Sequence, residues 1–174
     1  MTPTRLAFAL VLAASSAHAD SPRCDVSTDA GIDAAYKAAT GHEMSTYGGR
    51  CVERSETFKG LIVVGSFASD LGCRWEGVLN GCKWNDRGAP RAAMAAAGWA
   101  KANAAKRQEL ALAWLREIDQ VRVEDEKVTA DKDKVTIEYY EHGPVGMTPT
   151  PPPRYHYRVV FGADGTHGAI TSLK

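Results

Sequence analysis

Apolar and polar residues alternate along three segments in the C-terminal half of the chain, and this period of two predicts β-strands. The segments cover residues 120–128, 134–141 and 154–161. Side chains two positions apart lie on the same face of a strand. In the last segment one face carries only large apolar and aromatic residues, namely Tyr155, Tyr157, Val159 and Phe161. We expect that face to line a core.

A fourth strand is expected at 169–173. Asp164-Gly165 favours a tight turn, which would return the chain onto the preceding strand. In that register Ile170 lies opposite Val159. The four strands then form an antiparallel meander, and the acidic and basic residues of 124–134 form a charged turn within it.

Helical periodicity dominates residues 90–118, where Pro90 suits the first turn of a helix and alanine is abundant. An apolar stripe at the spacing i, i+3, i+4, i+7 would face a sheet. It consists of Ala111, Trp114, Leu115 and Ile118. Gly98 weakens the middle of the segment, so the pattern is compatible with a kink or a break into two helices.

The N-terminal half combines a helical segment with strands. Residues 28–40 predict a short helix, with Asp29 as its cap and Gly41 as its stop. The β-branched run 59–67 predicts a buried strand. Asn80-Gly81 predicts a hairpin, because both central residues of a type I′ turn need a positive φ.

The sequence Gly-Cys-basic-Trp occurs twice, at 72–75 and 81–84. If Asn80-Gly81 is the turn, Leu79 lies opposite Cys82, and both tryptophans share one face of the hairpin. That face would carry Cys73, Trp75, Leu79, Cys82 and Trp84. We expect it to pack in the core, and stacking of the two exposed indoles on a sugar is the alternative.

Residues 1–19 have the pattern of a cleaved secretory signal. One basic residue precedes a short apolar run, and Ala17-His18-Ala19 supplies a small-x-small cleavage site. The run is too short to cross a bilayer, which needs about 20 residues. We therefore expect a periplasmic or secreted protein that is not inserted in a membrane after cleavage.

Four cysteines in an exported protein predict two disulfides. The cysteines are Cys24, Cys51, Cys73 and Cys82. The Asn80-Gly81 register keeps Cys73 and Cys82 apart and would pair them with Cys24 and Cys51 in either order. A turn at Gly77-Val78 would instead join Cys73 to Cys82. The spacing lacks the close C-x-x-C pairs of a zinc or redox site.

These elements predict an α+β fold in a single domain over residues 20–174. A disulfide-braced segment with a β-hairpin (20–86) precedes the long helix (90–118) and the four-stranded antiparallel meander (120–174). The order of helix and meander is similar to that of cystatin-like and related α+β roll domains, at the level of the fold only. Fold likeness of this kind does not transfer function.

Charge and motifs exclude several function classes. The chain has 21 basic and 21 acidic residues, with no basic run, so we expect no nucleic-acid partner. His42-Glu43 lacks the second histidine of a zinc-protease helix, and neither Ser66 nor Ser69 lies in a nucleophile motif. We expect no catalytic residues, metal or cofactor.

One group of polar residues is a candidate binding site. If 134–141 and 154–161 pair, their outward faces bring together Glu138, Tyr140, His156 and Arg158, with His142 beside them. The proline-rich loop 143–154, which contains Met147, adds a stiff segment of polyproline II type next to this face. The same residues would also suit an ordinary solvated sheet face.

Two hypotheses for function follow. The first is an exported, non-catalytic binding protein, such as an inhibitor or an immunity-type protein, whose partner is another envelope or secreted protein. Tyrosine, arginine and methionine are enriched at such interfaces. The alternative is a small periplasmic or secreted hydrolase with a polar cleft on the sheet face.

Overall fold

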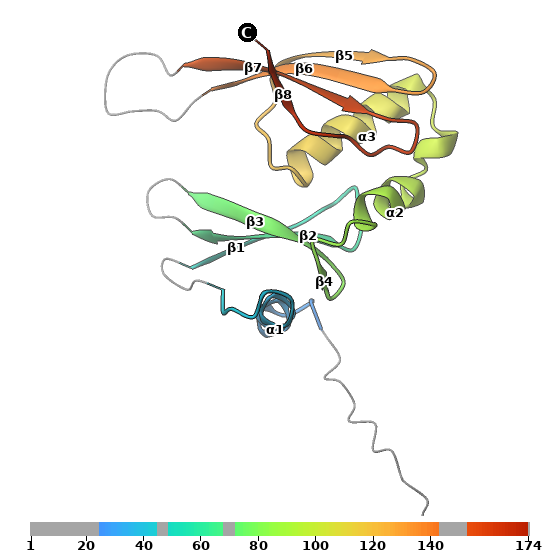
Figure 1. Ribbon diagram of the computed structural model, residues 1–174. Coiled ribbons are helices and arrows are strands. Elements are labelled where there is room, and N and C mark those ends of the chain that lie inside the picture. Colours follow the sequence, from blue (N-terminus) through green and yellow to red (C-terminus); the bar gives the residue numbers. More distant parts are fainter. Residues whose placement is uncertain (1–24, 45–48, 68–71, 143–152, 174) are drawn as a thin grey trace, which may run out of the picture.

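The computed structural model describes residues 25–44, 49–67, 72–142 and 153–173 and has an α+β fold, as predicted. Helix α1 (Asp29–Thr40) lies on one side of a four-stranded sheet, and helices α2 (Ala89–Ala96) and α3 (Ala104–Glu117) lie between this sheet and a second one (Figure 1). No helix in the described part of the chain is long and apolar enough to cross a membrane.

Both sheets are antiparallel meanders. The N-terminal sheet has the order β1-β2-β3-β4 and the C-terminal sheet the order β5-β6-β7-β8. The N-terminal strands are β1 (Arg50–Arg54), β2 (Leu61–Phe67), β3 (Cys73–Asn80) and β4 (Lys83–Trp84). The C-terminal strands are β5 (Glu124–Ala130), β6 (Val135–His142), β7 (Arg154–Phe161) and β8 (Thr171–Leu173). Each half of the chain is thus helix followed by meander.

The predicted C-terminal meander is confirmed, with two differences: the strand predicted at 120–128 is β5 at Glu124–Ala130, and the predicted charged turn is mostly part of that strand. Arg158 pairs with Thr171, which is the register expected for the last two strands. The segment 124–134 is not a charged turn, because β5 occupies its first seven residues and pairs with β6. The turn is confined to Asp131–Lys134, where Asp131 N donates to the Lys134 carbonyl at 2.9 Å. The run of charged residues from Glu124 to Lys127 is compatible with a strand that is largely exposed to solvent.

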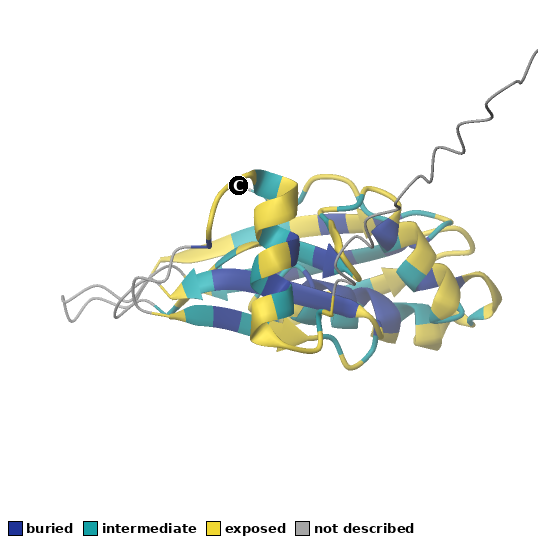
Figure 2. Ribbon diagram, turned by 90° about the horizontal axis from the view of Figure 1, so that it is seen from below, coloured by how far each residue is buried: buried dark blue, intermediate teal, exposed yellow. Residues whose placement is uncertain are grey.

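Helix α1 covers the outer face of the N-terminal sheet, where its buried residues contact β2 and β3 (Figure 2). Thr28, and not Asp29, is the N-cap, since its hydroxyl accepts a hydrogen bond from Gly31 N at 3.1 Å. Gly41 ends the helix in the left-handed conformation, as predicted. Tyr36 packs edge-on against Trp84, with 4.9 Å between ring centroids.

The predicted helix 90–118 is divided into three pieces. Gly98, at φ 86°, separates α2 from a 3₁₀ turn, η2 (Trp99–Lys101), because this left-handed conformation cannot continue a helix. Asn103 then starts α3, and its side chain accepts a hydrogen bond from Lys106 N. The glycine and the cap together account for the break.

Helix α3 makes the main core by packing on both sheets. All four residues of the predicted apolar stripe are buried. Trp114 contacts Phe58 of the β1–β2 connection, with 4.9 Å between the ring centroids. Residues from both sheets join the same cluster, including Leu61 and Val63 from β2, Val135 and Ile137 from β6, and Val159 and Phe161 from β7. The C-terminal end of α3 is tied to the β1–β2 connection by Glu117, which accepts hydrogen bonds from Ser55 and Thr57.

The hairpin of β3 and β4 differs from the prediction by one residue. Asn80 pairs with Lys83 and Leu79 with Trp84, so Gly81-Cys82 forms the two-residue turn. A bulge at Glu76 adds one residue to β3, which pairs Gly77 with Val64 but Trp75 with Gly65. The two tryptophans therefore do not share a face. Trp75 packs on the central core, whereas Trp84 packs beneath α1.

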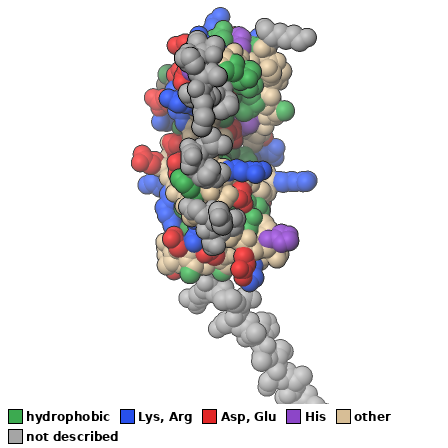
Figure 3. All heavy atoms as spheres, turned by 90° about the vertical axis from the view of Figure 1, so that its left-hand side faces the viewer, with side chains coloured by type: hydrophobic (Ala, Val, Ile, Leu, Met, Phe, Trp, Pro, Cys, Tyr) green, Lys and Arg blue, Asp and Glu red, His purple; other side chains and the backbone are tan. Residues whose placement is uncertain are grey.

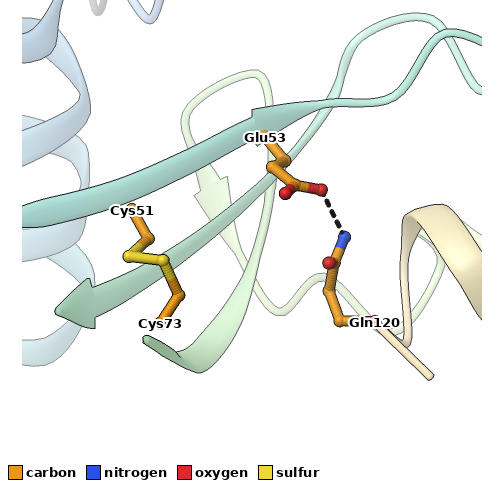
Figure 4. The surroundings of a disulfide bond; sticks show 4 residues. All are labelled: Cys51, Glu53, Cys73 and Gln120. Carbon is orange, nitrogen blue, oxygen red and sulfur yellow. Dashed lines mark hydrogen bonds between the residues drawn. A yellow bond between two sulfur atoms is a disulfide. The ribbon is translucent and has the colours of Figure 1, made fainter. Parts of the chain in front are cut away.

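The disulfide Cys51–Cys73 joins β1 to the start of β3, and both strands pair with β2 (Figure 4). The two Cα atoms are 5.9 Å apart. This bond agrees with one of the two predicted orders and rules out a bond from Cys73 to Cys82. Cys82 is also disulfide-bonded, and Cys24 lies outside the described residues. Disulfides indicate an oxidising, non-cytoplasmic environment.

Gly65 permits the close approach of β3 to β2 beside this disulfide. A Cβ atom at this position would lie 2.3 Å from the Arg74 carbonyl oxygen and 2.9 Å from Trp75 Cα. Both neighbours are backbone atoms, which cannot rotate away. The absence of a side chain at residue 65 is therefore a condition for the path of β3.

Peptide mapping without reduction is expected to yield a fragment that links Cys51 to Cys73. Because the chain has four cysteines and Cys82 is bonded, the second linked fragment should contain Cys24 and Cys82. A fragment that links Cys73 to Cys82 would contradict this pairing.

Replacing Cys51 and Cys73 together by serine should lower the free energy of unfolding by about 2–5 kcal/mol.

The substitution Gly65→Ala should lower the free energy of unfolding by about 1–3 kcal/mol, because the new methyl group displaces the β3 backbone. Urea titration followed by circular dichroism measures the change. Gly168→Ala is the matched control, since a Cβ atom there meets nothing within 4 Å. Equal stability of the two variants would show that β3 does not depend on the close approach.

Candidate functional site

The structure brings four of the predicted site residues together on the outward side of the C-terminal sheet. Glu138 of β6 pairs with Arg158 of β7, and Tyr140 pairs with His156. Their neighbours Tyr139 and Val159 point to the core and are buried. Met147, the fifth predicted residue, lies outside the described residues.

Glu138 and Arg158 form a cross-strand ion pair. Arg158 Nε and Nη2 donate to Glu138 Oε1 at 2.9 Å and 2.6 Å. The hydrogen bond from Arg158 lowers the pKa of Glu138 below its usual value. His156 Nε2 lies 4.0 Å from the other carboxylate oxygen, so the carboxylate is flanked by two basic side chains.

The aromatic part of this surface is a stack around Tyr140. The rings of Tyr140 and His156 are 4.4 Å apart and nearly parallel, with 9° between their planes. The Arg154 guanidinium lies over the Tyr140 ring, 4.0 Å from its centroid, and forms an ion pair with Asp125. At this distance the guanidinium is attracted by the ring face.

We name these five residues, Glu138, Tyr140, Arg154, His156 and Arg158, the outer sheet face. Arg154 was not among the predicted site residues, although its position two residues before His156 places it on the same face. Asp125 was missed because the predicted site was built only from the pairing of 134–141 with 154–161, whereas Asp125 lies on β5. At the edge of the face, His142 Nδ1 lies 2.6 Å from Glu124 Oε2.

A second candidate site is a cleft of about 600 Å³ on the side of α3. It lies between the β4–α2 connection, the C-terminal end of α3 and the connection from β7 to β8. Its lining residues are Arg87, Gly88, Pro90, Arg91, Trp114, Asp119, Thr166 and His167. The sequence pattern gave no signal for this cleft, because its walls come from segments far apart in the chain.

His167 and Asp119 form a partly buried pair in the wall of the cleft. His167 Nε2 lies 2.8 Å from Asp119 Oδ2, and His167 Nδ1 lies 2.6 Å from the Gly168 carbonyl oxygen. Trp114 Nε1 donates to the other Asp119 oxygen at 3.2 Å. The Gly168 carbonyl can only accept, so Nδ1 carries a proton, and the Asp119 carboxylate attracts a positive charge at Nε2 although its Oδ2 is not aligned for a hydrogen bond.

The geometry therefore favours the imidazolium form of His167. Burial alone would lower the pKa of His167. The close contact with Asp119 and its negative charge, together with the Gly168 carbonyl, outweigh burial and raise it above the usual value. The raised pKa favours the charged imidazole, so the geometry is that of an ion pair between His167 and Asp119.

No cluster suited to a metal ion occurs among the residues that the structure describes. Thr166, the hydroxyl residue next to His167, donates its hydroxyl hydrogen to Asp164 and does not face the imidazole as a nucleophile would. The two sites present groups that can bind a ligand or a partner. The sheet has an aromatic and cationic surface, and the cleft has charged walls.

The His167–Asp119 pair should make stability depend on pH. Since the folded-state pKa of His167 is raised, its contribution is complete below the unfolded value of about 6.5 and is lost as pH rises through the folded pKa. At pH 6, His167→Gln should lower the free energy of unfolding by about 1–3 kcal/mol. The difference from the parent should shrink towards pH 9.

Urea unfolding of both proteins between pH 5.5 and 9 measures this difference. His42→Gln is the control, because His42 is an exposed residue in the turn after α1. A stability difference for His167→Gln that stays constant across this range would show that the protonated imidazole is not what holds the β7–β8 connection to α3.

Comparison with known proteins finds no matching family, no similar curated protein and no similar solved structure.

Proposed function

We propose that the protein is an exported, non-catalytic binding protein that docks onto another envelope or secreted protein through the outer sheet face. Export is supported by the disulfide between Cys51 and Cys73 and by the signal pattern of residues 1–19. An inhibitor or an immunity-type protein is the kind of molecule that this proposal describes.

The observation that carries the proposal is the stack of Arg154, Tyr140 and His156 on a sheet face that no described helix covers (Figure 1). Tyrosine and arginine are the residue types most enriched among the anchors of protein interfaces. An aromatic side chain with a polar tip buries a large area and still satisfies its hydroxyl group. Tyr140 is therefore the expected anchor.

The outer sheet face is already organised for binding. Glu138 holds Arg158, and Asp125 holds Arg154, so neither guanidinium has to be ordered by the partner. Each long side chain that is ordered in advance avoids about 0.5–1.5 kcal/mol of entropy loss on docking. The face thus presents a rigid group of ring and guanidinium surfaces.

The charges of the face indicate a protein partner. Acidic residues lie beside the basic ones, and acidic and basic side chains are also interspersed on the side of the molecule seen in Figure 3. Such a surface does not provide the uniformly basic footprint that binds phosphate backbones. Because His156 and Arg154 cover the two faces of the Tyr140 ring, the partner should contact the edge and the hydroxyl group of Tyr140 and offer acceptors for the two arginines beside it.

A photoreactive phenylalanine analogue at position 140 is expected to crosslink the partner in intact cells of the source organism. The same analogue at position 155 is the matched control, since Tyr155 lies on the same strand pair but on the opposite face of the sheet and is 45% exposed. Mass spectrometry of the crosslinked product identifies the partner.

Affinity for the identified partner then tests the anchor. Tyr140→Ala and Arg154→Ala should each raise the dissociation constant at least fivefold, which corresponds to about 1 kcal/mol, whereas Tyr155→Ala should leave it unchanged. Circular dichroism should show the same fold for all three variants. Equal binding by all variants would contradict the proposal. Turnover of an envelope substrate that His156→Ala abolishes would replace it with the hydrolase hypothesis.

A further inference from the structure

The cleft beside α3 continues into a second, more apolar pocket. This pocket has a volume of about 250 Å³ and shares Arg87, Pro90, Trp114 and Asp119 with the cleft. Its inner wall is formed by Leu61, Val78, Ala89, Trp114 and Ile118, which come from both halves of the chain. A cavity of about 150 Å³ lined by apolar side chains can hold a benzene ring, so this pocket has room for one.

Arg87 lines both the cleft and the apolar pocket, and no described residue forms an ion pair with it. It also makes no side-chain hydrogen bond among the described residues. The other basic groups of the cleft are neutralised, since Arg91 pairs with Asp164 at 2.8 Å and His167 lies 2.8 Å from Asp119. The unpaired positive charge of the cleft is therefore that of Arg87.

This arrangement selects the charge of a ligand. Guanidinium groups bind carboxylates through two parallel hydrogen bonds. Asp86, which has no ion pair among the described residues, also lines the apolar pocket, and its negative charge disfavours a ligand with a double charge, such as a phosphate monoester. A single carboxylate at Arg87 complements the single unpaired cation.

We propose that this cleft is a binding site for an apolar monocarboxylate. The carboxylate binds Arg87, and the attached apolar group enters the pocket against Trp114, Ile118 and Val78. The ligand is either a small free acid or the carboxyl end of a peptide with an apolar last residue, since both present the same chemistry. The site is separate from the outer sheet face and does not depend on the proposed docking function.

Phenylacetate and its neutral analogue phenylacetamide are suitable probes, because they share the ring and differ in the charge. Titration into ¹⁵N-labelled protein should shift the indole N–H resonance of Trp114, which lines both spaces and donates to Asp119. Phenylacetate should bind at least tenfold more tightly than phenylacetamide. Phenylacetamide binding as tight as phenylacetate binding would overturn the proposal.

Two variants locate the two ends of the ligand. Arg87→Gln should weaken phenylacetate binding at least tenfold, and Val78→Phe should abolish it by filling the apolar pocket. Arg74→Gln, a change at an exposed arginine of β3 outside both spaces, is the control and should bind as the parent does. Retention of full affinity in either Arg87→Gln or Val78→Phe would overturn the assignment.

Binding of peptides distinguishes the two possible sources of the carboxylate, a small free acid and the carboxyl end of a peptide. A tripeptide that ends in phenylalanine with a free carboxyl group should bind more tightly than phenylacetate if the natural ligand is a peptide end, and its amidated form should not bind. If the tripeptide binds less tightly than phenylacetate, the site is one for small free acids. Binding of the amidated tripeptide with equal affinity would contradict the role of Arg87.

Discussion

Helix α3 is buried between the two sheets, and the positions of the other elements depend on this packing. Trp114 contacts Phe58 on the side of the N-terminal sheet, and the same helix packs against strands β5 and β6 of the C-terminal sheet. Burying a large apolar side chain stabilises a fold by about 1.5–3 kcal/mol. Glu117 and Asp119 extend this role, because their hydrogen bonds and ion pair fasten the β1–β2 and β7–β8 connections to the end of the helix.

Both proposed surfaces follow from the position of α3. Since the helix covers the inner face of the C-terminal sheet, the side chains of Tyr140 and Arg158 on the opposite face remain available to a partner. At its C-terminal end the helix meets the β4–α2 connection, and the space left between them becomes the cleft that Arg87 helps to line. One packing arrangement thus leaves both the outer sheet face, for which we propose a protein partner, and the cleft, for which we propose a carboxylate ligand.

The agreement between sequence and structure is best where the pattern is local. Alternation predicted β7 with its observed bounds and β6 with a shift of one residue, and the apolar stripe 111–118 predicted which residues of that segment are buried. Strand β1 was not predicted, since Arg50–Arg54 has one buried residue in five and no clear alternation. The predicted positions of Trp75 and Trp84 on one face were wrong because the bulge at Glu76 moves Trp75 to the opposite face of β3. Strict alternation of apolar and polar residues does not reveal such an extra residue.

By itself the sequence determined the order of helices and strands in the C-terminal half, the register of the last two strands and the association of Glu138, Tyr140, His156 and Arg158, whereas it left open whether the segment 90–118 is kinked or broken near Gly98. These follow from side-chain periods, turn residues and the pairing of neighbouring strands, all of which act over a few residues or one turn. Only the tertiary structure decided that the N-terminal half forms a second meander, that Cys51 bonds to Cys73, that His167 reaches Asp119 and that Arg87, which no described residue pairs with, lies beside an apolar pocket. The disulfide joins residues 22 positions apart, and the pair of Asp119 and His167 joins residues 48 positions apart. Such contacts depend on how two sheets pack on one helix, which no local pattern specifies.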